Sequence, residues 1–466
     1  MSMITVTSPI DGRVLGEVKL STVEEVKEMV QKAKEAQPAW EATPLIKRVE
    51  ICRKIADLLV EREVEIGTSN TQEMGKPLVQ SITECEDAAT LLRGHSERAL
   101  HLYGQVLGQN IEEPELIFTK REALGVIGVI VPYNYPIELT YQKLAPALVC
   151  GDTCVVKVPR SNPLTIMGMK DLLAEAGVPE NVVQIYCSDG KTTEEAVTKN
   201  PDVAAIAMTG STAAGKQIFE AAGSTLKRLM LELGGNDPFI IFDDVDPKLA
   251  AQEIAGGRED CVGQICCGTK RVIIHEDVKD AVIEELIKVL EGWKVGDPME
   301  EDTIVSYLAT EEAAKEAQSQ VEYTVSQGAK LVWGRGNEEG GARFEPVILD
   351  GVTKDMDIAQ NMEVFAAVFP FITFKTEEEA IEIANNSDYG LSSGVLSGDT
   401  MRALRVAGKI QSGACVANGH GCYRIYEQPF GGYKHSGIGR EGISVGIEEF
   451  SQVKTIYLKG AFAEKE

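Results

Sequence analysis

Residues 204–216 read AAIAMTGSTAAGK. An apolar, strand-like run over 204–208 passes into a glycine-rich turn, Gly210 to Lys216, that opens a helix. Such a turn offers free N–H groups and the positive end of a helix dipole, which together can hold a phosphate. The stretch therefore predicts a strand of a parallel sheet with a phosphate-binding turn at its carboxyl end.

The same turn comes close to a P-loop without completing it. Position 217 is Gln, where a P-loop carries the Ser or Thr that holds Mg²⁺, and the pattern GxGxxG is also absent. A nucleotide hydrolase would therefore lack its metal ligand. A pyrophosphate site at the helix start and a plain glycine-rich connection both stay open.

Strands and helices alternate on both sides of this turn. Apolar, β-branched runs separated by helical stretches indicate a parallel sheet covered on both faces. In the first unit we expect strands over 124–131, 154–158, 182–187, 204–208 and 229–233 and a helix over 163–176. After residue 236 we expect strands over 239–242, 271–275 and 330–333 and helices over 278–291 and 310–327.

The remaining segments differ in pattern. Residues 22–68 and 71–103 have the spacing of amphipathic helices, while 104–123 is broken by Gly and Pro and suits a β-hairpin or arm. Residues 450–459 alternate like an exposed strand. Because an unpaired edge strand invites aggregation, pairing with another subunit is expected, and we predict an oligomer.

Composition narrows the class of protein. The chain has 466 residues, enough for two or three domains, and a formal charge of −26, which disfavours nucleic acid and membrane surfaces as partners. We find neither a signal-like N-terminus nor an apolar run of the about 18 residues that span a membrane. Ten irregularly spaced cysteines suggest reduced thiols and a cytoplasmic location, and five scattered histidines predict no metal site.

Two polar positions stand out against this background. Cys266 lies in GQICCG (263–268), and Glu232 ends an apolar run in LELGG (231–235). A cysteine in a glycine-containing loop and a carboxylate at the end of a buried strand suggest thiol chemistry with a nearby base. Any one cysteine among ten is more often a packing residue.

Polar groups also follow other predicted strands. Asn134, in PYNYP (132–136), could donate to an oxyanion, or could simply bond its own turn. Lys157 and Arg160, in KVPR (157–160), could bind ribose or phosphate, or be solvated surface charges. A glycine-rich loop, 429–441, could close over a site or be a mobile turn.

Together these motifs resemble one family, the aldehyde dehydrogenase superfamily, over nearly the whole chain. The motifs, in the family's order, are PYNYP, KLAPAL (143–148), KVP, MTGSTAAGK, LELGG, GQICC, MEVFAAV (362–368), SDYGLSSGV (387–395) and PFGGYKHSGIGRE (429–441). The resemblance implies an α/β fold with a Rossmann-like cofactor-binding domain (1–103 and 124–235), a second α/β catalytic domain (236–446) and a small β oligomerisation element (104–123 and 447–466). It also implies a homodimer or homotetramer.

The resemblance further implies how an aldehyde would be oxidised. Cys266 is the expected nucleophile, with Cys267 as the second choice, and Asn134 with the Cys266 backbone N–H would hold the oxyanion. Glu232 would activate water to hydrolyse the thioester. Relatives that form acyl-CoA lack this glutamate, so a free acid is the expected product.

Cofactor contacts follow in the same way. NAD or NADP would be bound by Lys157, Arg160, Gly210, Ser211, Leu233, Glu363, Phe365 and Tyr133, and Lys143 and Asn418 resemble supports of the catalytic loop. Many NAD-preferring members carry a glutamate at the position of Arg160. Because an arginine pairs with a 2′-phosphate, we expect NADP to be used and favoured.

The expected substrate pocket is polar. Its matching positions hold Glu138, Gln142, Cys422 and Arg424, with Phe430 nearby. This lining favours a small hydroxylated or anionic aldehyde, resembling lactaldehyde or succinic semialdehyde, over alkyl or benzylic ones. Ile265 replaces an arginine typical of members that oxidise glyceraldehyde 3-phosphate, which argues against a sugar phosphate.

Two other functions remain possible at this stage. A catalytically silent binding or structural protein could share the scaffold, but it would be expected to lack Cys266 or Glu232. A thiol esterase would use the same cysteine without a cofactor.

Overall fold

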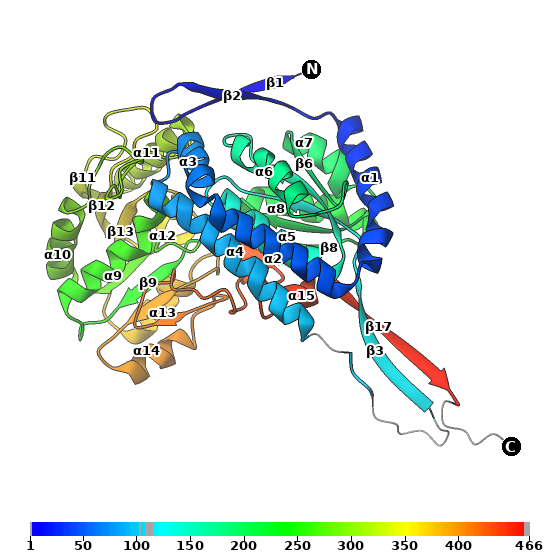
Figure 1. The fold of residues 1–466 in the computed structure, drawn as a ribbon. Coiled ribbons are helices and arrows are strands. Elements are labelled where there is room, and N and C mark those ends of the chain that lie inside the picture. The colour runs from blue at the N-terminus through cyan, green and yellow to red at the C-terminus, as the bar shows by residue number, and fades with distance from the viewer. Residues whose placement is uncertain (1, 102–103, 108–114, 461–466) are drawn as a thin grey trace.

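A computed structural model describes residues 2–101, 104–107 and 115–460. Two helix-covered sheets lie side by side, and a two-stranded arm projects from the body (Figure 1). Within those ranges, none of the helices combines the length and the apolar character needed to span a bilayer.

The first sheet contains the strands around the glycine-rich turn, in the order β16-β8-β7-β4-β5-β6. They are β4 (Val126–Ile130), β5 (Thr153–Val158), β6 (Val183–Cys187), β7 (Val203–Thr209), β8 (Arg228–Glu232) and β16 (Gly437–Ile438). All pair in parallel except β16, which is antiparallel to β8. The connecting helices are α5 (Pro136–Cys150), α6 (Leu164–Glu175), α7 (Gly190–Thr193), η1 (Glu194–Thr198), α8 (Thr212–Ala222) and η2 (Gly223–Thr225). The predicted parallel sheet is confirmed.

The strand order of this sheet fixes where a ligand can bind. The chain runs from β4 outward to β5 and β6, and then returns to the other side of β4 for β7 and β8. Loops that leave β4 and β7 therefore diverge to opposite faces, which opens a crevice at the carboxyl ends of these strands.

The second sheet has the order β11-β12-β13-β10-β9-β14-β15. Its strands are β9 (Pro238–Ile241), β10 (Arg271–His275), β11 (Lys330–Gly334), β12 (Val347–Val352), β13 (Val368–Phe374), β14 (Gly394–Leu396) and β15 (Val416–Ala417). Only β11 is antiparallel to its neighbour. Its helices are α9 (Pro247–Glu259), η3 (Asp260–Gly263), α10 (Lys279–Glu291), α11 (Glu311–Ser326), α12 (Asp357–Gln360), α13 (Glu377–Asn385) and α14 (Thr400–Ala407).

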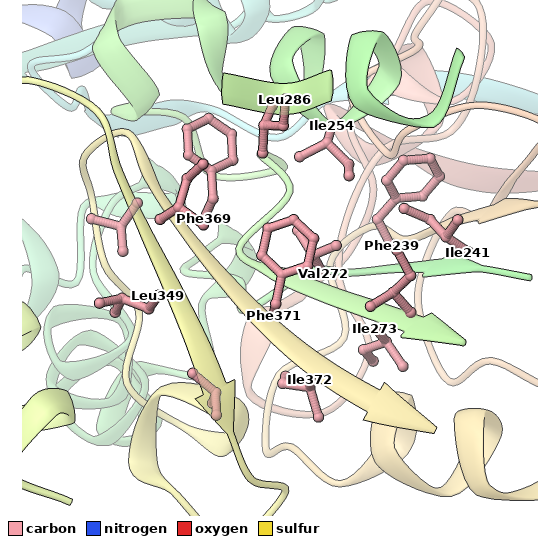
Figure 2. Close-up of a cluster of buried hydrophobic side chains, with 14 of the residues drawn as sticks. Phe239, Ile241, Ile254, Val272, Ile273, Leu286, Leu349, Phe369, Phe371 and Ile372 are labelled. Atoms are coloured by element: carbon pink, nitrogen blue, oxygen red, sulfur yellow. The ribbon is translucent and has the colours of Figure 1, made fainter. Parts of the chain in front are cut away.

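A large apolar cluster holds this second sheet to its helices. Figure 2 shows Phe239, Val272 and Phe371, which lie on the neighbouring strands β9, β10 and β13. Ile254 of α9 and Leu286 of α10 belong to the same cluster. All five side chains are at most 1% exposed, so this cluster fixes the strand β10 that follows the Cys266 loop.

The N-terminal region differs from the expectation of two long helices over 22–68 and 71–103. After the hairpin β1 (Met3–Thr7) and β2 (Val14–Lys19) come four helices, α1 (Val23–Ala42), α2 (Leu45–Glu61), α3 (Glu63–Met74) and α4 (Leu78–Leu100). Pro44 ends the first helix, because the residue before a proline avoids the helical region. Gly75, at φ 76°, and Pro77 separate the last two.

The projecting arm pairs β3 (Glu115–Ala123) with β17 (Ser451–Lys459) in antiparallel register. The C-terminal strand thus has one edge paired within its own chain (Figure 1). Residues 102–103, 108–114 and 461–466, which fall in the ranges expected for the cofactor domain and the arm, lie outside the described residues.

Before β17 come η4 (Lys434–Ser436) and α15 (Gly446–Glu449). Because β16 joins the first sheet, part of the range expected for the catalytic domain contributes to the other sheet.

Glu84 of α4 caps a helix that belongs to the first sheet. Helix α5 has no side-chain cap of its own, and Pro136 at its start has no N–H to donate. The Glu84 carboxylate accepts the backbone N–H groups of Ile137 (3.0 Å) and Glu138 (3.3 Å). Its other oxygen accepts Lys76 Nζ at 2.6 Å, and both side chains of this ion pair are buried.

We expect Glu84→Ala to loosen the start of α5, because it removes the cap and leaves Lys76 as a buried, unpaired charge. The loss should be about 3–5 kcal/mol. Hydrogen–deuterium exchange of peptides covering α5 measures it, and exposed Glu86→Ala on the same helix α4 is the control. Unchanged exchange in α5 would show that Glu84 does not hold this helix.

Candidate active site

One cavity of about 570 Å³ opens at the carboxyl ends of β4, β5, β7 and β8. Every catalytic and cofactor-binding residue expected from the sequence lines it: Cys266, Glu232, Asn134, Lys157, Arg160, Gly210, Ser211, Leu233, Glu363, Phe365 and Tyr133. Its position is the crevice that the strand order creates. The structure therefore brings together residues from both sheets that lie up to about 230 positions apart in the chain.

The half of the cavity beside the first sheet suits a dinucleotide. Ser211 caps α8, its hydroxyl accepting the N–H of Ala214 at 3.3 Å, so the positive helix end faces the cavity entrance formed by Gly210. A side chain at Gly215 would come within 2.5 Å of Leu233, so glycine allows the helix to pack closely on β8. These features fit a pyrophosphate at the helix start.

Lys157 and Arg160 lie at the end of β5 on the rim of the same half. Burial lowers the pKa of Lys157, whereas the Arg160 side chain is exposed. The nearby carboxylate of Asp189 is occupied as the cap of α7, where it accepts the N–H of Thr192 at 2.7 Å. Arg160 is thus an accessible cation for a phosphate group.

Cys266 sits on a strained loop between α9 and β10. Cys261 (φ 50°), Val262 (φ 55°) and Gly263 (φ 80°) all adopt left-handed backbone angles, which is costly for a β-branched residue. Gln80 of α4 accepts the N–H of Cys261 at 2.8 Å, and buried Arg258 donates to the carbonyl of Gly263 at 3.0 Å. Contacts from both sides therefore hold the turn that precedes Cys266.

The Cys266 thiol is surrounded by groups that disfavour its ionisation. Hydrogen bonding with the neighbouring Cys267 thiol, together with burial, holds the pKa of Cys266 well above its usual range. The Lys270 ammonium opposes this effect. A base close to the thiol is therefore needed to form the thiolate at neutral pH.

Asn134 faces the same loop from the start of α5. Its side chain is buried, and Nδ2 donates to the carbonyl of Gln264 at 2.8 Å. The Cys261 thiol donates to the Asn134 carbonyl, with sulfur and oxygen 3.7 Å apart. Since an amide nitrogen carries two N–H groups, Asn134 has a second donor beside Cys266.

Glu232 is the end residue of β8 and is 3% exposed. Within the described part of the chain neither carboxylate oxygen has a hydrogen-bond partner. Burial, followed by the nearby Cys266 and Glu441, holds its pKa well above the usual range, and Lys143 opposes them. A carboxyl group with a raised pKa beside a thiol has the properties of a general base.

Lys143 and Asn418, the expected supports of the catalytic loop, form side-chain hydrogen bonds with other segments of the chain. Lys143 donates to Thr209 Oγ1 at 2.7 Å and forms a buried ion pair with Glu441 at 2.8 Å, so it lies beside Glu232. The Asn418 side chain accepts the N–H of Ser397 in the second sheet, at 3.4 Å.

The expected substrate residues form a second cluster. Arg424 pairs with Glu138 at 3.7 Å, bonds Gln142 at 3.4 Å and lies 4.2 Å over the Phe430 ring. Phe430 belongs to an apolar group, with Ile265 and Cys267, against which Cys266 packs. The cluster thus reaches the nucleophile loop, and the Cys422 thiol joins it by donating to the Cys267 carbonyl. Burial raises the pKa of Glu138 to about 7.

Several residues with roles at this site were not identified from the sequence. Lys76, between α3 and α4, and Glu84 of α4 belong to no recognised motif, whereas Glu441 and Lys270 lie inside or beside recognised motifs. A lysine between a cysteine loop and a buried strand, as at position 270, was an available signal. Glu363, which was identified, accepts the N–H of Gly235 at 3.0 Å and pairs with Lys270 at 3.4 Å.

Comparison with known proteins agrees with this geometry. The model of the aldehyde dehydrogenase family matches residues 1–456. The chain is 33% identical to the mitochondrial succinate-semialdehyde dehydrogenase of Arabidopsis thaliana, over 98% of this chain and 86% of that protein. It is 32% identical to the lactaldehyde dehydrogenase of Methanococcus aeolicus, over 97% and 96%.

A solved structure extends the comparison to the fold. The glyceraldehyde-3-phosphate dehydrogenase of Methanocaldococcus jannaschii, in complex with NADP, superposes with a TM-score of 0.92 at 31% identity, covering 98% of this chain and 99% of that one. The fold, the residues that line the cavity and the similarity along the whole chain therefore all indicate the same family. The chain belongs to the aldehyde dehydrogenase family and is an NAD(P)-dependent enzyme that oxidises aldehydes.

Proposed function

We propose that this enzyme converts a small, oxygen-bearing aldehyde to the free carboxylic acid, with Cys266 as nucleophile, Glu232 as base and NADP as the favoured cofactor. The observation that supports this most directly is the single cavity shared by Cys266, Glu232 and Asn134 with the cofactor-binding residues. A thiol, a base, an amide donor and a dinucleotide crevice are the parts that this oxidation requires.

In the first step Glu232 takes the thiol proton and the Cys266 sulfur bonds to the aldehyde carbon. The carbonyl oxygen becomes an oxyanion, which the second N–H of Asn134 and the Cys266 backbone N–H stabilise. Bound NAD(P)⁺ supplies the hydride acceptor, and the carbon becomes a thioester. Glu232 passes the thiol proton to solvent and, again a carboxylate, removes a proton from water as the water attacks the thioester, which releases the acid and the Cys266 thiolate.

Lys143 and Glu441 assist this proton transfer from behind Glu232. The buried ammonium of Lys143 favours the charged form of Glu232, while the Glu441 carboxylate favours the neutral form. Glu232 can therefore gain and lose a proton during each turnover rather than remain fixed in one state.

The cluster of expected substrate residues around Arg424 favours oxygen-bearing substrates. Gln142 Nε2 and Arg424 Nε are buried donors without a partner among the described residues. A hydroxyl or carboxylate on the substrate would satisfy them, whereas an alkyl chain would leave both unpaired. The similarity to succinate-semialdehyde and lactaldehyde dehydrogenases points to the same class.

The projecting arm supports an oligomer. Val453, Tyr457 and Leu458 on β17 are 58%, 48% and 54% exposed, which is unfavourable for a free two-stranded ribbon. Pairing of the arm with another copy would cover them, and we propose a homodimer or homotetramer.

A reducing location such as the cytoplasm is also proposed. All ten cysteines are free thiols. Several are deeply buried packing residues, for which a thiol is the ordinary state in a reducing compartment.

For the base, we expect Glu232→Gln to lower steady-state turnover by about 100-fold or more. Hydride transfer precedes hydrolysis, so a first burst of NADPH absorbance should survive if another base can still ionise Cys266. In the wild type, turnover should rise with pH as Glu232, whose pKa is raised, loses its proton. This rise should be absent in the variant, and a variant that turns over normally would remove Glu232 from the mechanism.

For the substrate, an aldehyde panel is the direct test. We expect kcat/KM for lactaldehyde or succinic semialdehyde to exceed that for hexanal and benzaldehyde by about tenfold or more, since one unpaired buried donor costs about 1–3 kcal/mol. Cys266→Ala should abolish turnover with every aldehyde while NADP still binds. Preference for hexanal would refute the polar pocket, and an active Cys266→Ala variant would move the nucleophile, first to Cys267.

For the cofactor, we expect Arg160→Glu to reverse the preference from NADP toward NAD. The change removes the partner of the 2′-phosphate and repels it, so the ratio of kcat/KM for the two cofactors should shift by about tenfold or more. Arg62→Glu, a surface charge reversal on the N-terminal helices, is the control. A wild type that prefers NAD, with a ratio unchanged in Arg160→Glu, would contradict this assignment.

A further inference from the structure

Lys270 connects the nucleophile loop to a carboxylate of the cofactor half. Its side chain is 1% exposed and precedes β10. Nζ donates to the carbonyl of Ile265 at 2.9 Å and to the carbonyl of Cys266, and it lies 3.4 Å from Glu363. One buried ammonium thus contacts the backbone of the proposed nucleophile and a carboxylate that is proposed to bind the cofactor.

We propose that Lys270 is a positioning residue, which keeps the Cys266 backbone and the Glu363 carboxylate at a fixed separation within the active site. The inference rests on the proposed function, because it takes Cys266 as the nucleophile and Glu363 as a cofactor contact. The three contacts use the three N–H groups of an ammonium, so a neutral or shorter side chain cannot replace it.

The charge of Lys270 has a second effect, on the thiol itself. The titratable groups recorded around Cys266 are Glu232 at the end of β8, Asp237 before β9 and Lys270, together with Cys267, Tyr135 and Cys422 of the apolar group against which Cys266 packs. Apart from Lys270, these are acids, which oppose formation of a thiolate. Lys270 is therefore the neighbouring cation that favours the thiolate against these acids.

The adjacent residue provides a matched comparison. Arg271 is also a buried cation, 1% exposed, but its guanidinium donates to the backbone carbonyls of Asn236, Ala359, Ile383 and Ala384 within the second domain. Loss of Arg271 should destabilise the fold without changing the thiol. If Lys270 were only structural, its loss would have the same consequence.

The test is the rate at which iodoacetamide alkylates Cys266 in the enzyme without cofactor, followed by peptide mapping to separate Cys266 from Cys267 and Cys422. We expect Lys270→Met to slow alkylation at neutral pH by about tenfold, equivalent to about one pKa unit, and to shift the pH profile upward. Lys270→Arg, which keeps the charge, should stay within about threefold of the wild type. Arg271→Met should lower the melting temperature and leave the alkylation rate unchanged.

A second readout concerns Glu363. In Lys270→Met the dissociation constant for NADP, measured by fluorescence titration, should rise while Arg271→Met binds normally. Wild-type alkylation together with normal NADP binding in Lys270→Met would overturn the inference. Should that variant not fold, Lys270→Gln, which retains a donor without the charge, gives the same comparison.

Failure of this inference can be told apart from failure of the proposed function. If Cys266→Ala remains active, Cys266 is not the nucleophile, and the proposed role of Lys270 is refuted as well. If Cys266→Ala is inactive but Lys270→Met shows wild-type alkylation and normal NADP binding, only the role of Lys270 is refuted.

Discussion

Three successive left-handed residues, Cys261 to Gly263, turn the chain just before the proposed nucleophile, and the geometry of the site depends on them. Such angles cost about 1–3 kcal/mol at a non-glycine position. Gln80 from the N-terminal helices and Arg258 from the second domain bond the two ends of the turn. Because the strained turn is held from both sides, Cys266 is presented at the crevice between the sheets.

The chemistry then follows from charges buried in a limited space. Burial raises the pKa of Glu232, Glu441 adds to this effect and Lys143 opposes it, while Lys270 opposes the raised pKa of the Cys266 thiol. In a region with little water each charge acts strongly on its neighbours. A thiol and a carboxyl group that would both be unreactive alone can then exchange one proton.

The sequence predicted those features that local pattern controls. Apolar runs predicted both parallel sheets, and the catalytic and cofactor-binding residues taken from the motifs all line the cavity, including Glu363 and Phe365 from the distant second domain. The sequence predicted two N-terminal helices instead of four, because the apolar periodicity continues across Pro44 and Gly75, where helices end. Glu84 was missed for another reason, because its partners are the backbone N–H groups of a helix more than fifty residues away, which no spacing in the sequence reveals.

The cap that Glu84 places on α5 bears on how modular this architecture is. Glu84 of α4 precedes the first sheet by about forty residues, yet its carboxylate fixes helix α5, which carries Glu138 and follows the turn that contains Asn134. The N-terminal helices therefore cannot be exchanged freely between relatives. A chimera that joins them to the sheets of a relative would need to carry the Lys76–Glu84 pair with it, and natural recombination between members would meet the same boundary.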